Sequence, residues 1–279
     1  MAGAPDHAPL EEPIRGNVLG VGVDRLEHRE AVELALAAMR QQMPWRISLL
    51  AVHGVMGGAL HGQRRRLLNR FELNLTCGQP VRWALNLLDS ADLRTRVYGP
   101  DFTLAISEAA AREGLQVFLY GSSETVLDRL AEELSGRFPG LVIAGRRAST
   151  FRPISEAEQD EIAAEIAGSG ASICFVGLGC PRQENFIDVM APRSGVAMAG
   201  VGGSFEFIAG TKPSAPDWMK RSGVEWVFRL QSEPRRLWRR FLFLNPLYLA
   251  LLAAQRAGLW RPTATGRRGD PPGDEVVPG

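Results

Sequence analysis

Short apolar runs alternate with longer amphipathic segments through most of the chain. The apolar runs predict strands, and segments in which apolar residues recur every three or four positions predict helices. We expect strands at residues 18–23, 47–52, 95–98, 116–120, 141–144, 172–176 and 196–199. We expect helices at residues 29–43, 101–113, 123–138 and 155–167. The last helix has a start signal, because Ser155 and Glu158 form a capping-box pattern.

Strands that alternate with helices of ten or more residues indicate βαβ units. Such units build an α/β, Rossmann-like fold with a mostly parallel sheet and helices on both faces. We expect this core over residues 17–211 and a basic helical segment over residues 212–261. The ends, 1–16 and 262–279, are rich in Pro, Gly and charge and are predicted to be disordered.

Composition is that of a soluble globular protein. The 279 residues are 45% apolar and 23% charged, enough for a core without disulfide or metal support. Three cysteines and four histidines show no zinc-binding spacing, so no metal is expected. The first twenty residues include acidic side chains and no apolar run, so we expect no secretory signal and a cytoplasmic location.

The net charge of +1 is unevenly distributed. It is −5 for residues 1–211, +7 for 212–261 and −1 for 262–279. The basic segment favours an anionic partner, which could be nucleic acid, a phospholipid surface or a phosphorylated substrate. Nucleic acid is disfavoured because no binding motif accompanies the charge.

The same segment is rich in aromatic residues. Its apolar run, residues 241–254, is shorter than the ~20 residues that span a bilayer. Basic and aromatic residues side by side instead favour a helix that lies at a membrane surface. The alternative is a terminal helix that packs on the core or on a second copy of the chain.

Three glycine-bearing loops follow predicted strands, at residues 121–123, 177–184 and 200–205. In parallel sheets ligands bind beyond the carboxyl ends of the strands. Glycine lets the backbone approach a ligand, and a helix start supplies N–H groups for phosphate. Each loop alone could be an ordinary tight turn, but three together favour a nucleotide-type ligand. Neither the dinucleotide-binding fingerprint nor a P-loop is present.

Several stretches resemble the WecG/TagA/CpsF glycosyltransferases. They are Gly99-Pro100-Asp101, GLGCPRQENF from Gly177, GVGGSFEFIAG from Gly200, and APDWMKRSGVEWVFRLQSEPRRLWRR from Ala215. The resemblance covers about residues 17–260 and implies a Rossmann-like core with a C-terminal appendage. It also implies inverting transfer of a sugar from a UDP-sugar to an undecaprenyl-diphosphate-linked acceptor at the inner membrane face, in cell-envelope or exopolysaccharide biosynthesis.

The resemblance assigns roles to individual residues. Gln183 and Glu184 match a P-x-Q-E pair near the donor site, and Arg96 matches an arginine that meets the donor diphosphate. His53 lies in a stretch similar to N-V-H-x-V-M. Backbone contacts to the substrate are expected at Gly121, Gly177, Gly179, Gly202 and Gly203. The arginines expected to meet the acceptor diphosphate are Arg221, Arg229, Arg235 and Arg236.

Some positions depart from the family pattern. Leu49 and Ala51 stand where the family has T-x-N, and Ser214 stands where it has an arginine. Cys77 stands at the position of an aspartate taken as the general base, and Glu206 replaces an aspartate in the G-V-G loop.

These departures leave the base of an inverting transfer open, because the reaction needs a group that accepts the acceptor's proton. A thiol with an ordinary pKa of ~8.5 is a poor base, so Cys77 would need activation. His53, Glu184 and Glu206 are other candidates. There is no D-x-D motif, so no metal or other cofactor is expected. A second interpretation is a weakened or inactive homologue that binds nucleotide-sugar or lipid.

Overall fold

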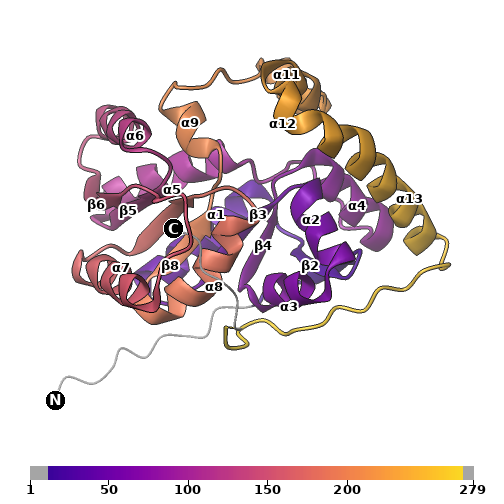
Figure 1. Cartoon of the computed structure of the whole chain (residues 1–279), viewed down its shortest axis with the longest axis horizontal. Helices are drawn as coiled ribbons and strands as arrows, with labels where there is room; N and C mark the ends of the chain where they lie inside the picture. Colours follow the sequence, from indigo (N-terminus) through magenta and orange to yellow (C-terminus); the bar gives the residue numbers. More distant parts are fainter. Residues whose placement is uncertain (1–11, 273–279) are drawn as a thin grey trace.

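The computed structural model describes residues 12–272, except the side chains of Asp217, Arg221, Arg236, Arg239 and Arg240. A six-stranded parallel sheet crosses the molecule in the order β4–β3–β8–β7–β5–β6 (Figure 1). Its strands are β3 (Arg46–Leu50), β4 (Leu73–Thr76), β5 (Gln116–Gly121), β6 (Val142–Arg147), β7 (Ile173–Gly177) and β8 (Ala197–Gly200). The predicted α/β fold is confirmed.

Nine helices of the described chain surround this sheet. They are α1 (His28–Arg40), α2 (Val52–Leu60), α3 (Gly62–Arg70), α4 (Gln79–Asp89), α5 (Gly99–Glu113), α6 (Glu124–Arg137), α7 (Glu156–Gly168), α8 (Arg182–Ser194) and α9 (Ser204–Ile208). The capping box at the start of α7 is confirmed, since Ser155 Oγ accepts from the Glu158 amide at 3.3 Å.

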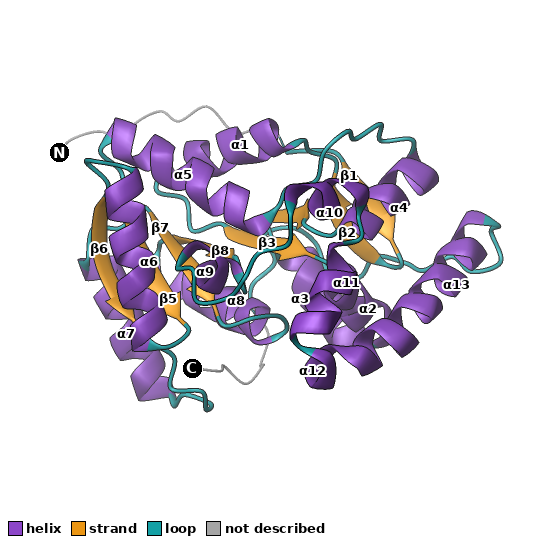
Figure 2. Ribbon diagram, turned by 90° about the horizontal axis from the view of Figure 1, so that it is seen from above, coloured by secondary structure: helices purple, strands orange, loops and turns teal. Residues whose placement is uncertain are grey.

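Alternating side chains of the strands divide the core into two layers. Val117 and Leu119 of β5 pack with α1, α5, α6 and α9 on one face. Phe118 and Tyr120 of the same strand pack with α2, α3, α4, α7 and α8 on the other (Figure 2). Both faces are therefore covered, which explains why the central strands are apolar on both sides.

Two predicted strands differ from the structure, and one strand of the structure was not predicted. The predicted strand at 18–23 is a hairpin of β1 (Arg15–Val18) and β2 (Val21–Asp24), because Leu19 and Gly20 take positive φ and reverse the chain. Residues 95–98 form no strand; the Glu27 carboxylate instead accepts from the Thr95 amide. β4 was not predicted, although Leu73 and Leu75 show the alternation of an edge strand.

Four helices and a π turn follow the core. They are α10 (Asp217–Ser222), α11 (Glu225–Ser232), α12 (Pro234–Arg239), the π turn η1 (Arg240–Leu244) and α13 (Asn245–Arg256). α13 lies over α2 and α4 (Figure 1), where the buried Tyr248 donates its hydroxyl proton to the Pro80 carbonyl at 3.0 Å. Among the described residues, no helix combines the length and the apolar character that crossing a membrane requires.

Residues 262–272, which we call the C-terminal strap, return along the core. Buried Asn69 donates to the Thr265 carbonyl at 2.9 Å, and Arg268 pairs with buried Asp24 at 2.8 Å. The predicted disorder is therefore wrong for this part of the tail, because polar side chains of the core bind its backbone. It is also wrong for Arg15 and Gly16 at the other end, which belong to β1. Residues 1–11 and 273–279 of the predicted ends lie outside the described residues.

A buried ion cluster joins this strap to the core. Arg46, at the start of β3, binds Glu72 at 2.8 Å and Asp188 of α8 at 3.1 Å, and also donates to the Asp270 carbonyl at 2.9 Å. Asp188 is fully buried and also pairs with Arg70 at 2.6 Å. Removing one partner from such a cluster leaves buried charge without compensation.

We predict that Arg46→Met lowers the free energy of unfolding by about 3–5 kcal/mol. The reason is that Glu72 loses its guanidinium partner and Asp188 loses one of its two arginine partners. Arg40→Met, which breaks an exposed pair with Glu113, serves as the control and should cost less than ~1 kcal/mol. Urea denaturation of both variants measures the difference. Similar small losses in the two variants would contradict the role given to the cluster.

Candidate functional site at the carboxyl edge of the sheet

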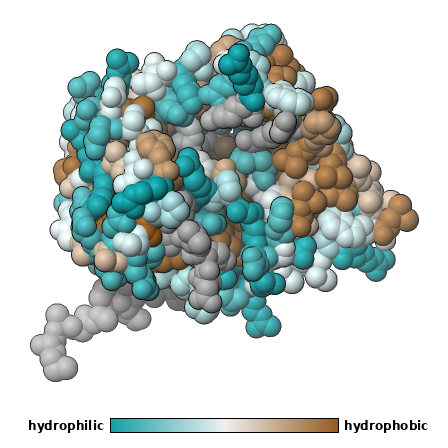
Figure 3. All heavy atoms as spheres, in the orientation of Figure 1, coloured by the Kyte–Doolittle hydropathy of each residue, from teal (hydrophilic) through white to brown (hydrophobic). Residues whose placement is uncertain are grey.

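The loops predicted to hold a ligand meet where the six parallel strands end, a region we call the carboxyl edge. The backbones come very close there: a Cβ on Gly78 would lie 3.1 Å from the Ala51 Cα. The space-filling view shows the surface hollowed between α9 and the helices α11 and α12, above this edge (Figure 3).

The glycines of these loops fall into two groups. A Cβ on Gly121 would lie 2.9 Å from the Gly177 carbonyl carbon, and a Cβ on Gly177 would lie 2.4 Å from the Phe205 ring. These two positions need glycine for internal packing. A Cβ on Gly179 would meet nothing within 4 Å, and Gly202 would approach Gln183 at 3.4 Å. Only the second group leaves backbone open to a ligand.

Gln183 and Glu184 begin α8 and are almost fully buried beneath these loops. The Gln183 amide donates to the Gly200 carbonyl and to Glu184 Oε1, both at 3.0 Å. Ser48 of β3 donates to the same Oε1 at 3.2 Å. The Glu184 carboxylate therefore connects the start of α8 to β3, and the Gln183 amide connects it to β8.

Several polar atoms at this edge are buried without a hydrogen-bond partner. They are Gln183 Oε1, Glu184 Oε2, Thr76 Oγ1 and His53 Nδ1. Buried polar atoms in proteins are nearly always satisfied. A group of exceptions in one place, just beyond the strand ends, indicates a region that is built to bind a polar ligand.

The side chains around Glu184 favour uncharged forms. Burial raises the pKa of Glu184, and hydrogen bonds from Gln183, its own backbone N–H, the Cys180 thiol and Ser48 offset this in part. Burial and the nearby Glu184 carboxylate raise the pKa of the Cys180 thiol well above its ordinary value. Cys180 is therefore a thiol at neutral pH, and Glu184 is a carboxylate that gains a proton more readily than usual.

Cys77 follows β4 at the same edge. Burial raises the pKa of its thiol, although Arg96 and Arg229 lie close enough to oppose that effect. The thiol therefore stays protonated at neutral pH and shows no sign of activation as a nucleophile or base.

A second cluster lies beside Cys77 and connects α11 to the core. Glu225 of α11 accepts from Arg96 at 2.6 Å and from Arg229 at 2.9 Å, and the Tyr98 hydroxyl donates to it at 3.3 Å. The Arg96 guanidinium also stacks 4.4 Å from the centre of the Tyr98 ring. Sequence reasoning missed Glu225 and Tyr98 as site residues, although Glu225 stands in the motif on which the resemblance rests.

The other predicted residues are spread over the rim. Arg96 is engaged by Glu225 rather than open to a diphosphate, whereas the Arg229 side chain is 41% exposed. Glu206 pairs with Lys212 at 2.9 Å, and Lys212 also binds Glu233 at 3.0 Å. Gly203 adjoins the Glu206 carboxylate. Arg235 is exposed on α12, and the side chains of Arg221 and Arg236 lie outside the described part.

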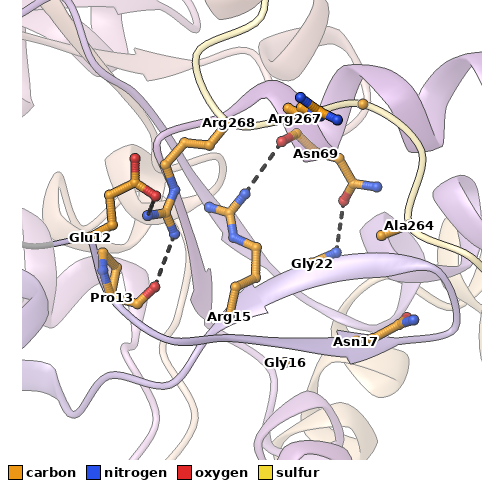
Figure 4. Close-up of a pocket in the computed structure, with 11 residues that line it drawn as sticks. Glu12, Pro13, Arg15, Gly16, Asn17, Gly22, Asn69, Ala264, Arg267 and Arg268 are labelled. Atoms are coloured by element: carbon orange, nitrogen blue, oxygen red, sulfur yellow. Dashed lines mark hydrogen bonds and ion pairs between the residues drawn. The ribbon is translucent and has the colours of Figure 1, made fainter.

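A hollow of about 470 Å³ lies elsewhere, between the hairpin and the C-terminal strap. Arg15 and Arg268 extend into it, and Asn69 donors and acceptors line its wall (Figure 4). None of its lining residues belongs to the loops of the carboxyl edge. Within residues 12–272, no group of three or more His, Cys, Asp or Glu side chains could hold a metal ion.

Comparisons with known proteins identify the family of the chain. The model of the glycosyl transferase WecG/TagA/CpsF family matches residues 16–262. The chain is 34% identical over 176 residues to the N-acetylglucosaminyldiphosphoundecaprenol N-acetyl-beta-D-mannosaminyltransferase of Bacillus spizizenii. The aligned stretch covers 63% of this chain and 66% of the relative. The protein of the same description in Bacillus subtilis is 30% identical over 173 residues, 62% of this chain and 65% of the relative. The chain thus spans just under two thirds of either relative.

We predict that Glu225→Gln loosens α11 by about 3 kcal/mol, because Arg96 and Arg229 lose their shared counter-charge. Burial opposes the charge on Glu225, but the two arginines outweigh it and lower its pKa. The stabilisation is therefore present above the ordinary glutamate pKa and is lost as pH falls through the lowered value.

Hydrogen exchange of the α11 amides between pH 7 and pH 3 measures this loss, with α5 as the internal reference. In the wild type the α11 protection should fall with pH, whereas in Glu225→Gln it should be low throughout. Glu113→Gln, an exposed paired carboxylate, is the matched control and should behave as the wild type does. Equal α11 protection in Glu225→Gln and the wild type would contradict the prediction.

Proposed function

Because the chain belongs to the WecG/TagA/CpsF glycosyl transferase family, we propose that it transfers a sugar from a UDP-sugar to an undecaprenyl-diphosphate-linked acceptor, with inversion, in cell-envelope or exopolysaccharide biosynthesis. The observation that carries the proposal is the set of unpartnered buried polar atoms at the carboxyl edge, beside the partly exposed Arg229. The relatives' names support a lipid-diphosphate acceptor.

The donor is proposed to bind over the loops that follow β7 and β8. There the backbone of Gly179 is open, and that of Gly202 faces the unpartnered Gln183 Oε1. Backbone N–H groups of such loops can bind phosphate oxygens, and the departing UDP needs its negative charge stabilised as the bond breaks. Arg96 and Arg229 both pair with Glu225, but the Arg229 side chain is 41% exposed and that of Arg96 only 12%, so Arg229 is the one proposed to contact the diphosphate.

The acceptor is proposed to approach from the C-terminal helices at the cytoplasmic face of the inner membrane. A broad apolar area covers α12, η1 and α13 (Figure 3). Large apolar and aromatic side chains of α11, α12, η1 and α13 are 41–64% exposed: Trp226, Trp238, Leu242, Phe243, Leu247 and Leu249. We call this set the apolar surface. Exposed apolar patches rimmed by basic residues are typical of proteins that bind a membrane surface.

A second candidate function is a binding module without transferase activity. It is favoured by one observation, the protonated Cys77 thiol at a position where a base was sought. Such a chain would bind UDP without transferring a sugar.

The transfer assay uses UDP-N-acetylmannosamine and an acceptor that carries N-acetylglucosamine on a lipid diphosphate, with other UDP-sugars as alternatives. We expect turnover, and we expect Arg235→Ala to raise the KM for the acceptor about tenfold, because one charge-assisted contact is worth ~1.5–3 kcal/mol. Arg256→Ala, an exposed arginine on α13, is the control and should leave KM unchanged. UDP binding by calorimetry without any turnover would favour the binding module.

The apolar surface predicts membrane association. Leu242→Glu with Phe243→Glu should reduce partition onto vesicles of anionic phospholipid by more than tenfold, because each buried apolar side chain contributes ~1.5–3 kcal/mol. Val142→Glu with Phe151→Glu adds the same charge at other exposed apolar positions and should have little effect. Flotation of both variants with vesicles measures the difference. Equal flotation of the two would exclude the apolar surface as the membrane contact.

A further inference from the structure

An inverting transfer needs a group that accepts the acceptor's proton, and most candidates at the carboxyl edge are unsuited to it. The Cys77 thiol is held protonated by burial. Glu206 is paired with Lys212, and Glu225 is paired with two arginines that lower its pKa. A carboxylate stabilised by a cation is a weak base, because protonation must first overcome the ion pair.

Two other groups remain near the strand ends. His53 Nδ1 is buried without a partner, so the ring lacks the hydrogen-bonded acceptor that orients a histidine base. Asp101, at the start of α5, is exposed to solvent. Neither has the surroundings that a base requires.

Glu184 differs from all of these. Among the side chains that the structure describes, no arginine or lysine pairs with it. Its Oε1 accepts from Ser48 at 3.2 Å and from Gln183 at 3.0 Å, and the Cys180 thiol and the backbone N–H of Glu184 also bond to the carboxylate. Its second oxygen, Oε2, is buried and has no hydrogen-bond partner. A carboxylate that is held in place by hydrogen bonds and still has one oxygen without a partner is arranged to accept a proton.

The loops near this carboxylate contain glycines and therefore carry few side chains. Gly179 carries none, and a Cβ there would meet no atom within 4 Å. Gly202 lies on the other side, where a Cβ would stand 3.9 Å from the Gly179 Cα and 3.4 Å from Gln183 Oε1. Two glycine backbones therefore lie close to each other beside Gln183, where a ligand would meet few side chains.

We propose that Glu184 is the catalytic base of this chain; the inference rests on the proposed transferase function. As the acceptor oxygen forms its bond to the anomeric carbon of the donor sugar, the bond from that carbon to the UDP oxygen breaks and its electron pair leaves with UDP. The hydroxyl proton passes to Glu184 Oε2. The resulting carboxylic acid returns the proton to water after the products leave.

The surroundings of Glu184 suit this cycle. Ser48 on β3 and Gln183 on α8 are uncharged, and the Cys180 thiol before α8 is protonated at neutral pH. Arg64 of α3 is near enough to act on that thiol. Burial raises the pKa of Glu184, so turnover should fall as pH drops through that raised value.

The test compares Glu184→Gln with the wild type in the transfer assay, across pH 4.5–8. The amide oxygen can still accept from Ser48 and Gln183, so the fold should be kept, and equal thermal denaturation midpoints verify this. We expect kcat to fall about 10²–10⁴-fold, the usual contribution of a general base. The Kd for UDP should change less than twofold, and the acidic limb of the kcat profile should disappear. Glu132→Gln, an exposed carboxylate on α6, is the matched control and should keep the wild-type profile.

The outcomes separate the two proposals. If the wild type transfers sugar and Glu184→Gln keeps its turnover within threefold of the wild type, the role of Glu184 is overturned. The transferase function is then unaffected. A variant His53→Gln that alone removes the acidic limb also overturns it. If the wild type binds UDP but transfers no sugar to any acceptor of the assay, the transferase function fails and the role of Glu184 fails with it.

Discussion

The buried Glu225 carboxylate connects α11, one of the C-terminal helices, to the core. Glu225 of α11 receives Arg96 from the loop before α5 and Arg229 from its own helix, and the Tyr98 hydroxyl completes the cluster. The cost of burying three charges is offset only because each has a close partner of opposite sign or a hydrogen bond. The same contacts place Arg229 beside the carboxyl edge and leave part of it open. The proposed donor site depends on this arrangement.

The far end of the helical segment is held as well. Tyr248 of α13 bonds to the start of α4, and the C-terminal strap is bound by Asn69, Asp24 and Arg46 of the core. A segment anchored at both ends keeps its apolar surface at a fixed position relative to the strand ends. For an enzyme with a lipid-linked acceptor, this would hold the reacting centre at a constant height above the membrane.

Local patterns were enough to predict much of the fold. The alternation of strands and helices indicated the parallel sheet, and the Ser155 capping box marked the start of α7 correctly. The hairpin was missed because Leu19, a residue that rarely takes positive φ, stands in its turn. The ordered C-terminal strap was not predicted, because it is held by hydrogen bonds from core side chains such as Asn69, which are distant in sequence.

The candidate site shows the same limit. The run from Gly177 to Phe186 pointed to Gln183 and Glu184, but only the fold shows that one oxygen of Glu184 lacks a partner. Arg96 appeared open to a diphosphate until Glu225, more than a hundred residues later, was found against it. Pairings between distant charges cannot be read from spacing along a chain. They decide which residues remain available for chemistry.

A crystal structure of the chain with UDP bound tests the account most directly. The account requires the diphosphate to lie at the carboxyl edge, over the Gly179 and Gly202 loops and within reach of Arg229. Density for UDP in the hollow between the hairpin and the strap, with the carboxyl edge empty, would contradict it.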